Sequence, residues 1–420
     1  MTGIPVPTDG HYKKLTADQE YKLKELYLVL MTTFGLASSE VKVGGKAPAA
    51  VVKKGRLGFG SKTITNEESY AEAIVNFKKC FSDRGIDLKV ASVKYADQVR
   101  HDFPDRLLLR FLRARKWDIA AAAAMFGKTL AWRCADVDIE ENLFRGDIYW
   151  INEEPDEGFI NQYREGKSVI PGQDKDGRPV VVITARKHDP RKQTSAAMRR
   201  YTLFTMEEAR LCLKGDTETA LVIFDLGGFG LHNMDMEVVK FIIECFEAHY
   251  PESLGRLLLH RAPRVFSTVW AVIKGLLDPV VASKIAFTKD EKDLLKMIDA
   301  SELPMDLGGS KSNEWHWPEP DAAYNAPLLE TEKRKQIEAD RSNLFEDFYK
   351  YTLEWVQADG EASKNLNAKR DQLMQDISDN YWQLDPYVRA RCGYDRTAKF
   401  AEFRTELAPG GVAQPLCKGV

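Results

Sequence analysis

The sequence predicts a mixed α/β fold, with a mainly parallel sheet, a helical region before it and a helical hairpin after it. Two observations lead to this prediction. Between residues 165 and 310, short and almost continuously apolar runs alternate with helical stretches, which is typical of parallel strands joined by crossover helices. By contrast, residues 65–135 and 330–384 carry apolar residues at helical spacing among many charged ones.

The N-terminal part begins with a predicted helix over residues 16–35. Thr16 and Gln19 have the spacing of a capping box, and an apolar stripe follows them. Residues 38–63 are rich in Gly, Ala and Lys and predict a linker. This linker is either a solvated tether or a weak attachment to anionic lipid. Its basic residues are Lys42, Lys46, Lys53, Lys54, Arg56 and Lys62.

Residues 65–135 predict further helices, interrupted at Pro104. Asp105 follows this proline and is a plausible N-terminal cap for the next helix. At the other end of the chain, residues 330–358 and 361–384 predict an αα-hairpin. Its apolar face needs a partner surface, and we expect it to pack on the N-terminal helices. That face comprises Leu344, Phe345, Phe348, Tyr351 and Trp355.

The central region contains four predicted strands, over residues 179–184, 221–225, 256–260 and 284–288. They are apolar along most of their length, as expected when both faces of a sheet are covered. The helices predicted between them span residues 195–214, 234–249 and 264–277.

Composition excludes several classes of function. The 420 residues carry a formal net charge of −3, which argues against nucleic-acid binding. The six cysteines form no CxxC pair, so we expect free thiols in a reducing compartment. The seven histidines show no metal-ligand spacing, and Asn233 stands where a dinucleotide fingerprint beginning at Gly228 needs its third glycine. No run approaches the roughly 20 apolar residues that span a bilayer, so any membrane contact is expected to be peripheral.

Two opposite charges, Glu252 and Lys284, bracket the predicted helix at 264–277. Pro251 ends the preceding helix and places Glu252 in the turn before a strand, while Lys284 stands at the head of the next strand. The pattern alone leaves open whether the two form a structural ion pair or a binding site. The bracketed helix has one apolar face, made by Phe266, Val269, Trp270, Ile273, Leu276 and Leu277.

Long motifs in this region resemble a known family. HYPESLGRLLLHRAPRVFSTVWAVIKGLLDPVVASKI, with LLLRFLRARKWD and GQDKDGRPV before it, resembles the yeast secretory-pathway phosphatidylinositol transfer type of the CRAL-TRIO family. The resemblance covers residues 104–310, and LDPYVRARCGYD resembles a fungal subgroup with a C-terminal helical extension. It implies a CRAL-TRIO lipid-binding fold with a gate helix. The implied segments are 1–63 (N-terminal helix and basic linker), 64–150 (helical N-terminal region), 151–312 (lipid-binding domain) and 313–420 (C-terminal extension).

The resemblance also implies roles for particular residues. Glu252 and Lys284 match ligands of the inositol headgroup, and Arg115 matches a basic residue that helps to bind the phosphoinositol group. Val281 departs from the family pattern, since it stands where the family has a hydroxyl ligand. The helix at 264–277 corresponds to the gate over the pocket.

The strand positions that hold phosphatidylcholine in some members are Ala220 and Val222 here. Neither side chain donates a hydrogen bond. Val169 and Ile170 stand in the region where the family has tyrosines, although a quaternary ammonium prefers aromatic faces. The resemblance therefore implies that phosphatidylcholine is not the second ligand.

The function implied by the resemblance is the binding of phosphatidylinositol and its exchange between an internal pocket and membranes. We expect a cytoplasmic monomer, peripheral on endoplasmic reticulum, Golgi or endosome membranes, without catalytic residues, metal, cofactor or nucleic-acid partner. One alternative is a phosphoinositide sensor that presents lipid to a kinase. Another is a carrier of a sterol or squalene-like molecule.

Overall fold

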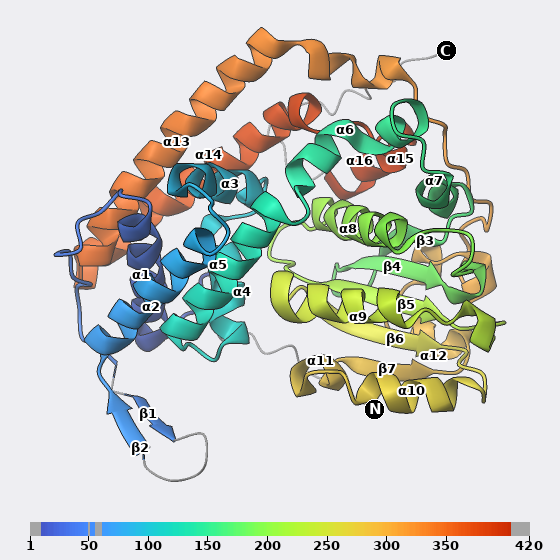
Figure 1. The fold of residues 1–420 in the computed structure, drawn as a ribbon, viewed down its shortest axis with the longest axis horizontal. Coiled ribbons are helices and arrows are strands. Elements are labelled where there is room, and N and C mark those ends of the chain that lie inside the picture. The colour runs from blue at the N-terminus through green and yellow to red at the C-terminus, as the bar shows by residue number, and fades with distance from the viewer. Residues whose placement is uncertain (1–9, 49–50, 55–60, 405–420) are drawn as a thin grey trace. The chain divides into compact units, whose positions relative to one another are not determined.

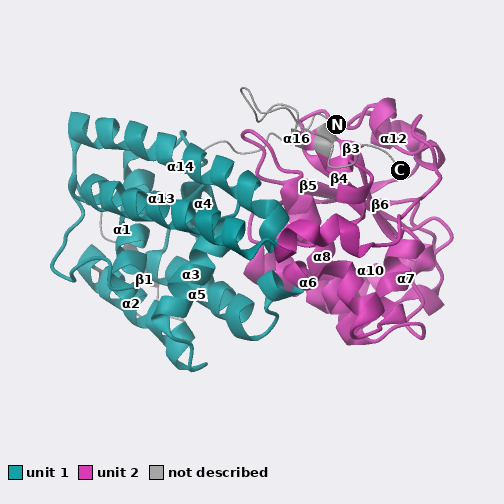
Figure 2. Cartoon of the chain, turned by 90° about the horizontal axis from the view of Figure 1, so that it is seen from above, with its two compact units in different colours: residues 1–142, 330–388 teal, residues 143–329, 389–420 magenta. Residues whose placement is uncertain are grey.

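A computed structural model describes residues 10–48, 51–54 and 61–404 (Figure 1). These residues form two compact units (Figure 2). Unit 1 is built from the chain up to residue 142 and from residues 330–388, and unit 2 from residues 143–329 and from residue 389 onward. The four consecutive segments implied by the resemblance do not correspond to these units, because the C-terminal hairpin belongs to the same unit as the N-terminal helices.

Unit 2 holds a five-stranded sheet in the order β3-β4-β5-β6-β7. β3 pairs antiparallel with β4, and the other neighbours are parallel, which confirms the predicted mainly parallel mixed sheet. The strands are β3 (Ser168–Gln173), β4 (Pro179–Thr184), β5 (Ala220–Asp225), β6 (Leu254–His260) and β7 (Ile285–Thr288).

Helices and short turns connect these strands, and α8 and α9 lie over one face of the sheet in Figure 1. The helices of unit 2 among the described residues are α7 (Glu157–Arg164), α8 (Ser195–Leu211), α9 (Met236–Glu244), α10 (Phe266–Lys274), α11 (Pro279–Ser283), α12 (Glu291–Leu295), α15 (Gly393–Arg396) and α16 (Lys399–Arg404). The 3₁₀ turns are η1 (Ala185–Lys187), η2 (Leu231–Asn233), η4 (Ala300–Glu302), η5 (Met305–Leu307) and η6 (Ala322–Leu329), and a π-helical turn, η3 (Cys245–His249), continues α9. The chain passes from unit 1 to unit 2 within α6 (Ile139–Asn152).

One face of this sheet forms a closed apolar core. Successive strand residues point to opposite faces, so alternate residues share a face. On this face the side chains of β4, β5 and β6 pack against α12 and the turns that follow it. The buried members of this core are Val180, Val182, Leu221, Ile223, Leu258, Leu294, Ile298, Leu303 and Leu307.

The structure corrects several predicted elements of unit 2. β3 was not predicted, because Pro171 and Gly172 interrupt its apolar run, and the pairing register shifts between Val169 and Gly172. The helix predicted at 264–277 ends at Lys274, where Gly275 caps it, and a separate short helix, α11, begins at Pro279. The helix predicted at 234–249 gives way to the π-helical turn after Glu244.

Residues 389–396, which include the second half of the C-terminal motif, are held in unit 2 by buried polar contacts. The Arg396 guanidinium pairs with Asp147 at 2.7 Å, and Arg389 pairs with Asp395 at 2.6 Å. The Tyr394 hydroxyl accepts a hydrogen bond from the backbone N–H of Ile170 at 3.0 Å. The second half of the motif that resembles the fungal subgroup therefore has a structural role in unit 2.

Unit 1 is helical, apart from an antiparallel pair formed by β1 (Val51–Lys54) and β2 (Ser61–Ile64). This pair corrects the prediction of a continuous linker over residues 38–63, in which glycines and lysines obscured two short β-branched runs. Arg56 lies outside the described residues. The helices of unit 1 among the described residues are α1 (Ala17–Thr33), α2 (Asn66–Ser82), α3 (Leu88–Val99), α4 (Pro104–Ala114), α5 (Ile119–Ala135), α13 (Thr331–Gln357) and α14 (Gly360–Val388).

Helix α1 begins as predicted and packs on the C-terminal hairpin. Thr16 and Gln19 form the capping box. Further along the helix, the Tyr27 ring lies 5.9 Å from the Phe348 ring and 6.3 Å from the Trp355 ring, measured between centroids. These contacts confirm that the α13–α14 hairpin packs on the N-terminal helices.

Asp105 connects the same helices through a buried ion pair. It is 4% exposed and lies within 2.5 Å of the Arg370 guanidinium, while the Tyr27 hydroxyl donates to it at 2.5 Å. The prediction that Asp105 caps α4 is therefore wrong: the cap residue is Phe103, which makes no side-chain cap bond. Arg370 is fully buried and also lies 4.0 Å from the centre of the Trp355 ring.

We predict that Arg370→Met destabilises the protein strongly. The substitution leaves the Asp105 carboxylate buried without its cation, and breaking a buried ion pair costs about 3–5 kcal/mol. Chemical denaturation of the full chain measures the loss. Lys364→Met, on the same helix, is the control, because Lys364 and its partner Glu361 have side chains that are 77% and 76% exposed. Equal effects of the two substitutions would contradict the structural role of Asp105.

Candidate functional site

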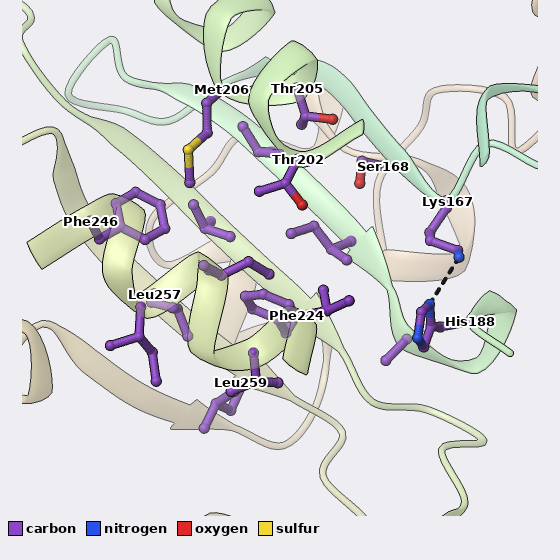
Figure 3. A pocket seen from close by; sticks show the side chains of 18 of the residues that line it. Lys167, Ser168, His188, Thr202, Thr205, Met206, Phe224, Phe246, Leu257 and Leu259 are labelled. Atoms are coloured by element: carbon purple, nitrogen blue, oxygen red, sulfur yellow. Dashed lines mark hydrogen bonds between the residues drawn. The ribbon is translucent and has the colours of Figure 1, made fainter. Parts of the chain in front are cut away.

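The second face of the sheet in unit 2 borders a cavity rather than a packed core. The cavity has a volume of about 250 Å³ and lies between the sheet and helices α8, α9 and α10. Figure 3 shows part of its lining, with Phe224 of β5 and with Leu257 and Leu259 of β6. Most of the lining side chains are apolar.

The cavity wall follows from the period of two along each strand. Ala220, Val222 and Phe224 alternate along β5 with Leu221 and Ile223, which belong to the closed core on the opposite face. The apolar side chains of the strands therefore form two sets. One set packs into the closed core, and the other set lines the cavity.

Helix α10 forms part of the cavity wall beside the edge strand β7 (Figure 1). Four residues of the predicted gate face line the cavity: Phe266, Trp270, Ile273 and Leu277. The other two differ, since Val269 is buried outside the lining and Leu276 is 42% exposed. Val269 lies within the regular helix, whereas Leu276 follows the break after Lys274.

Aromatic contacts hold α10 in place at its start and at its middle. The Phe266 ring lies 5.6 Å from the Phe229 ring, and the Trp270 ring lies 5.4 Å from the Phe287 ring, both edge to face. Such pairs contribute about 0.5–1.5 kcal/mol each beyond the area that they bury. The helix is thus held by a few side-chain contacts and not by sheet pairing.

Glu252 and Lys284 meet beside the cavity. The Lys284 ammonium donates to the Glu252 carboxylate at 3.2 Å, and the two side chains are 21% and 26% exposed. Glu252 adopts a φ of 55° in the turn before β6, and Lys284 precedes β7. Their chain neighbours Ser253 and Ile285 line the cavity, so the pair lies at its border.

Arg115 belongs to the other unit. It caps the C-terminal end of α4 in unit 1 and is exposed. Its part in a headgroup site therefore stays a prediction, as do the ligand roles of Glu252 and Lys284.

Sequence reasoning missed a second polar group in the cavity lining, formed by Lys167, His188 and Asp235. The Lys167 ammonium lies 3.0 Å from His188 Nδ1, and His188 Nε2 lies 3.3 Å from the Asp235 carboxylate. Burial lowers the pKa of Lys167 to about 8 and also lowers the pKa of His188. No motif joins these residues, because 21 and 47 positions separate the bonded pairs along the chain.

No described helix is long and apolar enough to cross a membrane. Within the same part of the chain, no group of three or more His, Cys, Asp or Glu side chains could hold a metal ion.

Comparison with known proteins assigns this architecture. Residues 163–309 match the CRAL/TRIO domain, and residues 74–128 match the CRAL/TRIO N-terminal domain. The chain is 36% identical to the phosphatidylinositol transfer protein CSR1 of Eremothecium gossypii, over 94% of this chain and 98% of the relative. It is 35% identical to the CRAL-TRIO domain-containing protein C3H8.02 of Schizosaccharomyces pombe, over 93% and 92% of the two chains.

A plant relative matches a smaller part. The phosphatidylinositol/phosphatidylcholine transfer protein SFH7 of Arabidopsis thaliana is 34% identical over 48% of this chain and 39% of its own length. The two fungal matches, by contrast, extend over nearly the whole sequence, including both units. Their extent, the two matched domains and the sheet with its cavity together show that this chain belongs to the CRAL-TRIO family.

Proposed function

We propose that this protein holds phosphatidylinositol in the cavity of unit 2 and exchanges it with membranes. The observation that carries the proposal is the apolar cavity with the Glu252–Lys284 pair at its border. The printed name of the Eremothecium relative, which describes a phosphatidylinositol transfer protein, supports the same lipid.

The apolar lining suits acyl chains. Each CH₂ group removed from water contributes about 0.8 kcal/mol, so a long chain gains much from the cavity. Exchange makes and breaks no covalent bond, and the protein acts as a carrier rather than as an enzyme.

The pair at the border suits the headgroup. The Glu252 carboxylate accepts hydrogen bonds from inositol hydroxyls, and charged acceptors of this kind bind them strongly. The Lys284 ammonium offsets the phosphodiester charge. The two side chains also pair with each other at 3.2 Å, which places the carboxylate and the ammonium close enough to contact one headgroup.

The lining of β5 disfavours phosphatidylcholine. Ala220 and Val222 border the cavity and donate no hydrogen bond to a phosphate. A buried polar group without a partner costs about 1–3 kcal/mol, and a charged one more. We therefore propose that phosphatidylcholine is not the preferred ligand.

A membrane-facing surface accompanies α10. Exposed apolar side chains occur on α10 and the residues that flank it, on α11 and on β7, which are neighbours in Figure 1: Val265, Val272, Leu276, Val280 and Phe287. We propose that this surface, called here the gate surface, inserts into the outer part of a bilayer. The reason is continuity, since the opposite side of α10 lines the cavity. A lipid that leaves when α10 moves thus meets an apolar medium and not water.

We predict that Glu252→Ala combined with Lys284→Ala abolishes phosphatidylinositol transfer between vesicles. The melting temperature should change little, because partly exposed ion pairs contribute about 0–1 kcal/mol. Glu302→Ala with Lys311→Ala is the matched control: that pair is also 3.2 Å apart and is 30% and 29% exposed, away from the cavity. Transfer at the wild-type rate by the first double variant would refute the headgroup assignment.

We further predict that Val272→Glu weakens binding to phospholipid vesicles by about tenfold, the equivalent of about 1.4 kcal/mol. The cause is the transfer of a charge from water into the outer bilayer. Vesicle co-sedimentation measures it. Met305→Glu is the control, because both residues are 56% exposed but Met305 lies in η5, outside the gate surface. If both variants bind vesicles equally well, another surface makes the membrane contact.

A further inference from the structure

The cavity has a second charged end that the proposed phosphatidylinositol site does not use. Lys167, His188 and Asp235 line the cavity, and Lys167 and His188 are 3% and 9% exposed. Figure 3 shows the Lys167–His188 hydrogen bond at one end of the pocket, with Phe246 and Leu257 lying toward the other.

The hydrogen bonds fix the charges of this group. An ammonium only donates, so Lys167 donates to His188 Nδ1, which must accept. His188 Nε2 then carries the ring proton and donates to the Asp235 carboxylate. The imidazole is therefore neutral, which agrees with its lowered pKa. The positive charge stays on Lys167.

The backbone holds Lys167 firmly in this position. Its N–H donates to the Gln162 carbonyl at 3.0 Å, and its carbonyl accepts from the Thr184 N–H at 2.8 Å. His188 is held by Asn233, whose side-chain amide donates to the His188 carbonyl at 2.7 Å. The site is thus preformed by β3, β4 and the η2 turn.

The Lys167 charge lacks a close counter-ion. No carboxylate of the described residues lies within ion-pair distance of its ammonium, and only one of its three N–H groups has a partner there. Glu165, Asp235 and Asp189 favour the charge from further away, and Lys192 disfavours it. A buried cation is stabilised by an anion, so this end of the cavity is complementary to an anionic group.

This end lies opposite the Glu252–Lys284 pair. Those two residues precede β6 and β7, at the amino ends of the parallel strands. Lys167 instead pairs with the end of β4, and His188 follows that strand. Strands of six residues such as β4 are about 20 Å long, so one headgroup cannot occupy both ends.

We propose that the Lys167–His188–Asp235 group binds the oxygen group of a second amphiphile with a single net negative charge, either a long-chain carboxylate or an anionic phosphodiester lipid such as phosphatidylglycerol. A single ammonium balances a single negative charge, whereas a neutral alcohol leaves it unbalanced. Ser168, Thr202 and Thr205 also border the cavity and add hydroxyls near this end (Figure 3). The proposal rests on the proposed function in so far as the cavity holds lipid.

Direct binding of oleate, dioleoyl phosphatidylglycerol and oleyl alcohol to the full chain tests this proposal. Lys167→Met should weaken binding of an anionic probe by about tenfold or more, the effect of losing a charged hydrogen bond. Lys192→Met is the control, because its side chain is 65% exposed and lies outside the lining. Oleyl alcohol should bind wild type and Lys167→Met alike. If Lys167→Met weakens the binding of oleate, the ligand is a carboxylate, and if it weakens the binding of phosphatidylglycerol, the ligand is a phosphodiester lipid. Unchanged binding of both anionic probes would overturn the proposal.

A pH series on the wild-type protein provides a test that needs no variant. Lys167 must be protonated to bind an anion, and its pKa is lowered to about 8. Affinity for the anionic probe should therefore fall about tenfold between pH 7 and pH 9, in proportion to the protonated fraction. Constant affinity over this range would contradict the proposal. Phosphatidylinositol transfer by the wild-type protein is measured separately. If transfer occurs but the affinity for the anionic probe does not depend on pH, the second site is refuted and the proposed function is not.

Discussion

The structure of unit 2 depends on the two different environments of its sheet. Alternate residues of β4, β5 and β6 face a closed core on one side and a cavity on the other. Leu221 and Ile223 gain free energy by packing, whereas Val222 and Phe224 have only a partial set of neighbours. An apolar cavity without contents forgoes dispersion contacts on every wall. An apolar ligand that fills the cavity would therefore gain dispersion contacts with the same strands that stabilise the fold.

Polar groups define the two ends of this cavity. At the amino ends of the strands, Glu252 and Lys284 neutralise each other. At the carboxyl ends, the one hydrogen-bond partner of the Lys167 ammonium among the described residues is a neutral histidine. The charges of the first end are paired with each other, whereas the second end carries an excess positive charge. For this reason we propose that the Glu252–Lys284 pair binds the inositol phosphate headgroup. We propose that Lys167 binds an amphiphile with a single negative charge. Carboxyl ends of parallel strands are also where ligands of open α/β sheets commonly bind.

Much of the fold was predictable from local patterns. The strand at 179–184, the Thr16–Gln19 capping box and the packing of the C-terminal hairpin all follow from residue spacing. The wrong role for Asp105 and the missed Lys167–His188 contact share one cause, which is pairing between residues far apart in the chain. Other differences are local, such as the interruption of β3 by Pro171 and Gly172. Asp105 has the position of a helix cap, yet its partner, Arg370, lies 265 residues away. Lys167 and His188 carry no motif, and the turn between β3 and β4 brings them together.

We propose that the cavity selects phosphatidylinositol through its borders and lining. Native mass spectrometry of the purified protein, with extraction and identification of the bound lipid, tests it most directly. The account predicts phosphatidylinositol as the bound phospholipid, at one molecule per chain, and little phosphatidylcholine, because Ala220 and Val222 give its phosphate no donor. Phosphatidylcholine as the main bound lipid, or protein purified without any phospholipid, would contradict it.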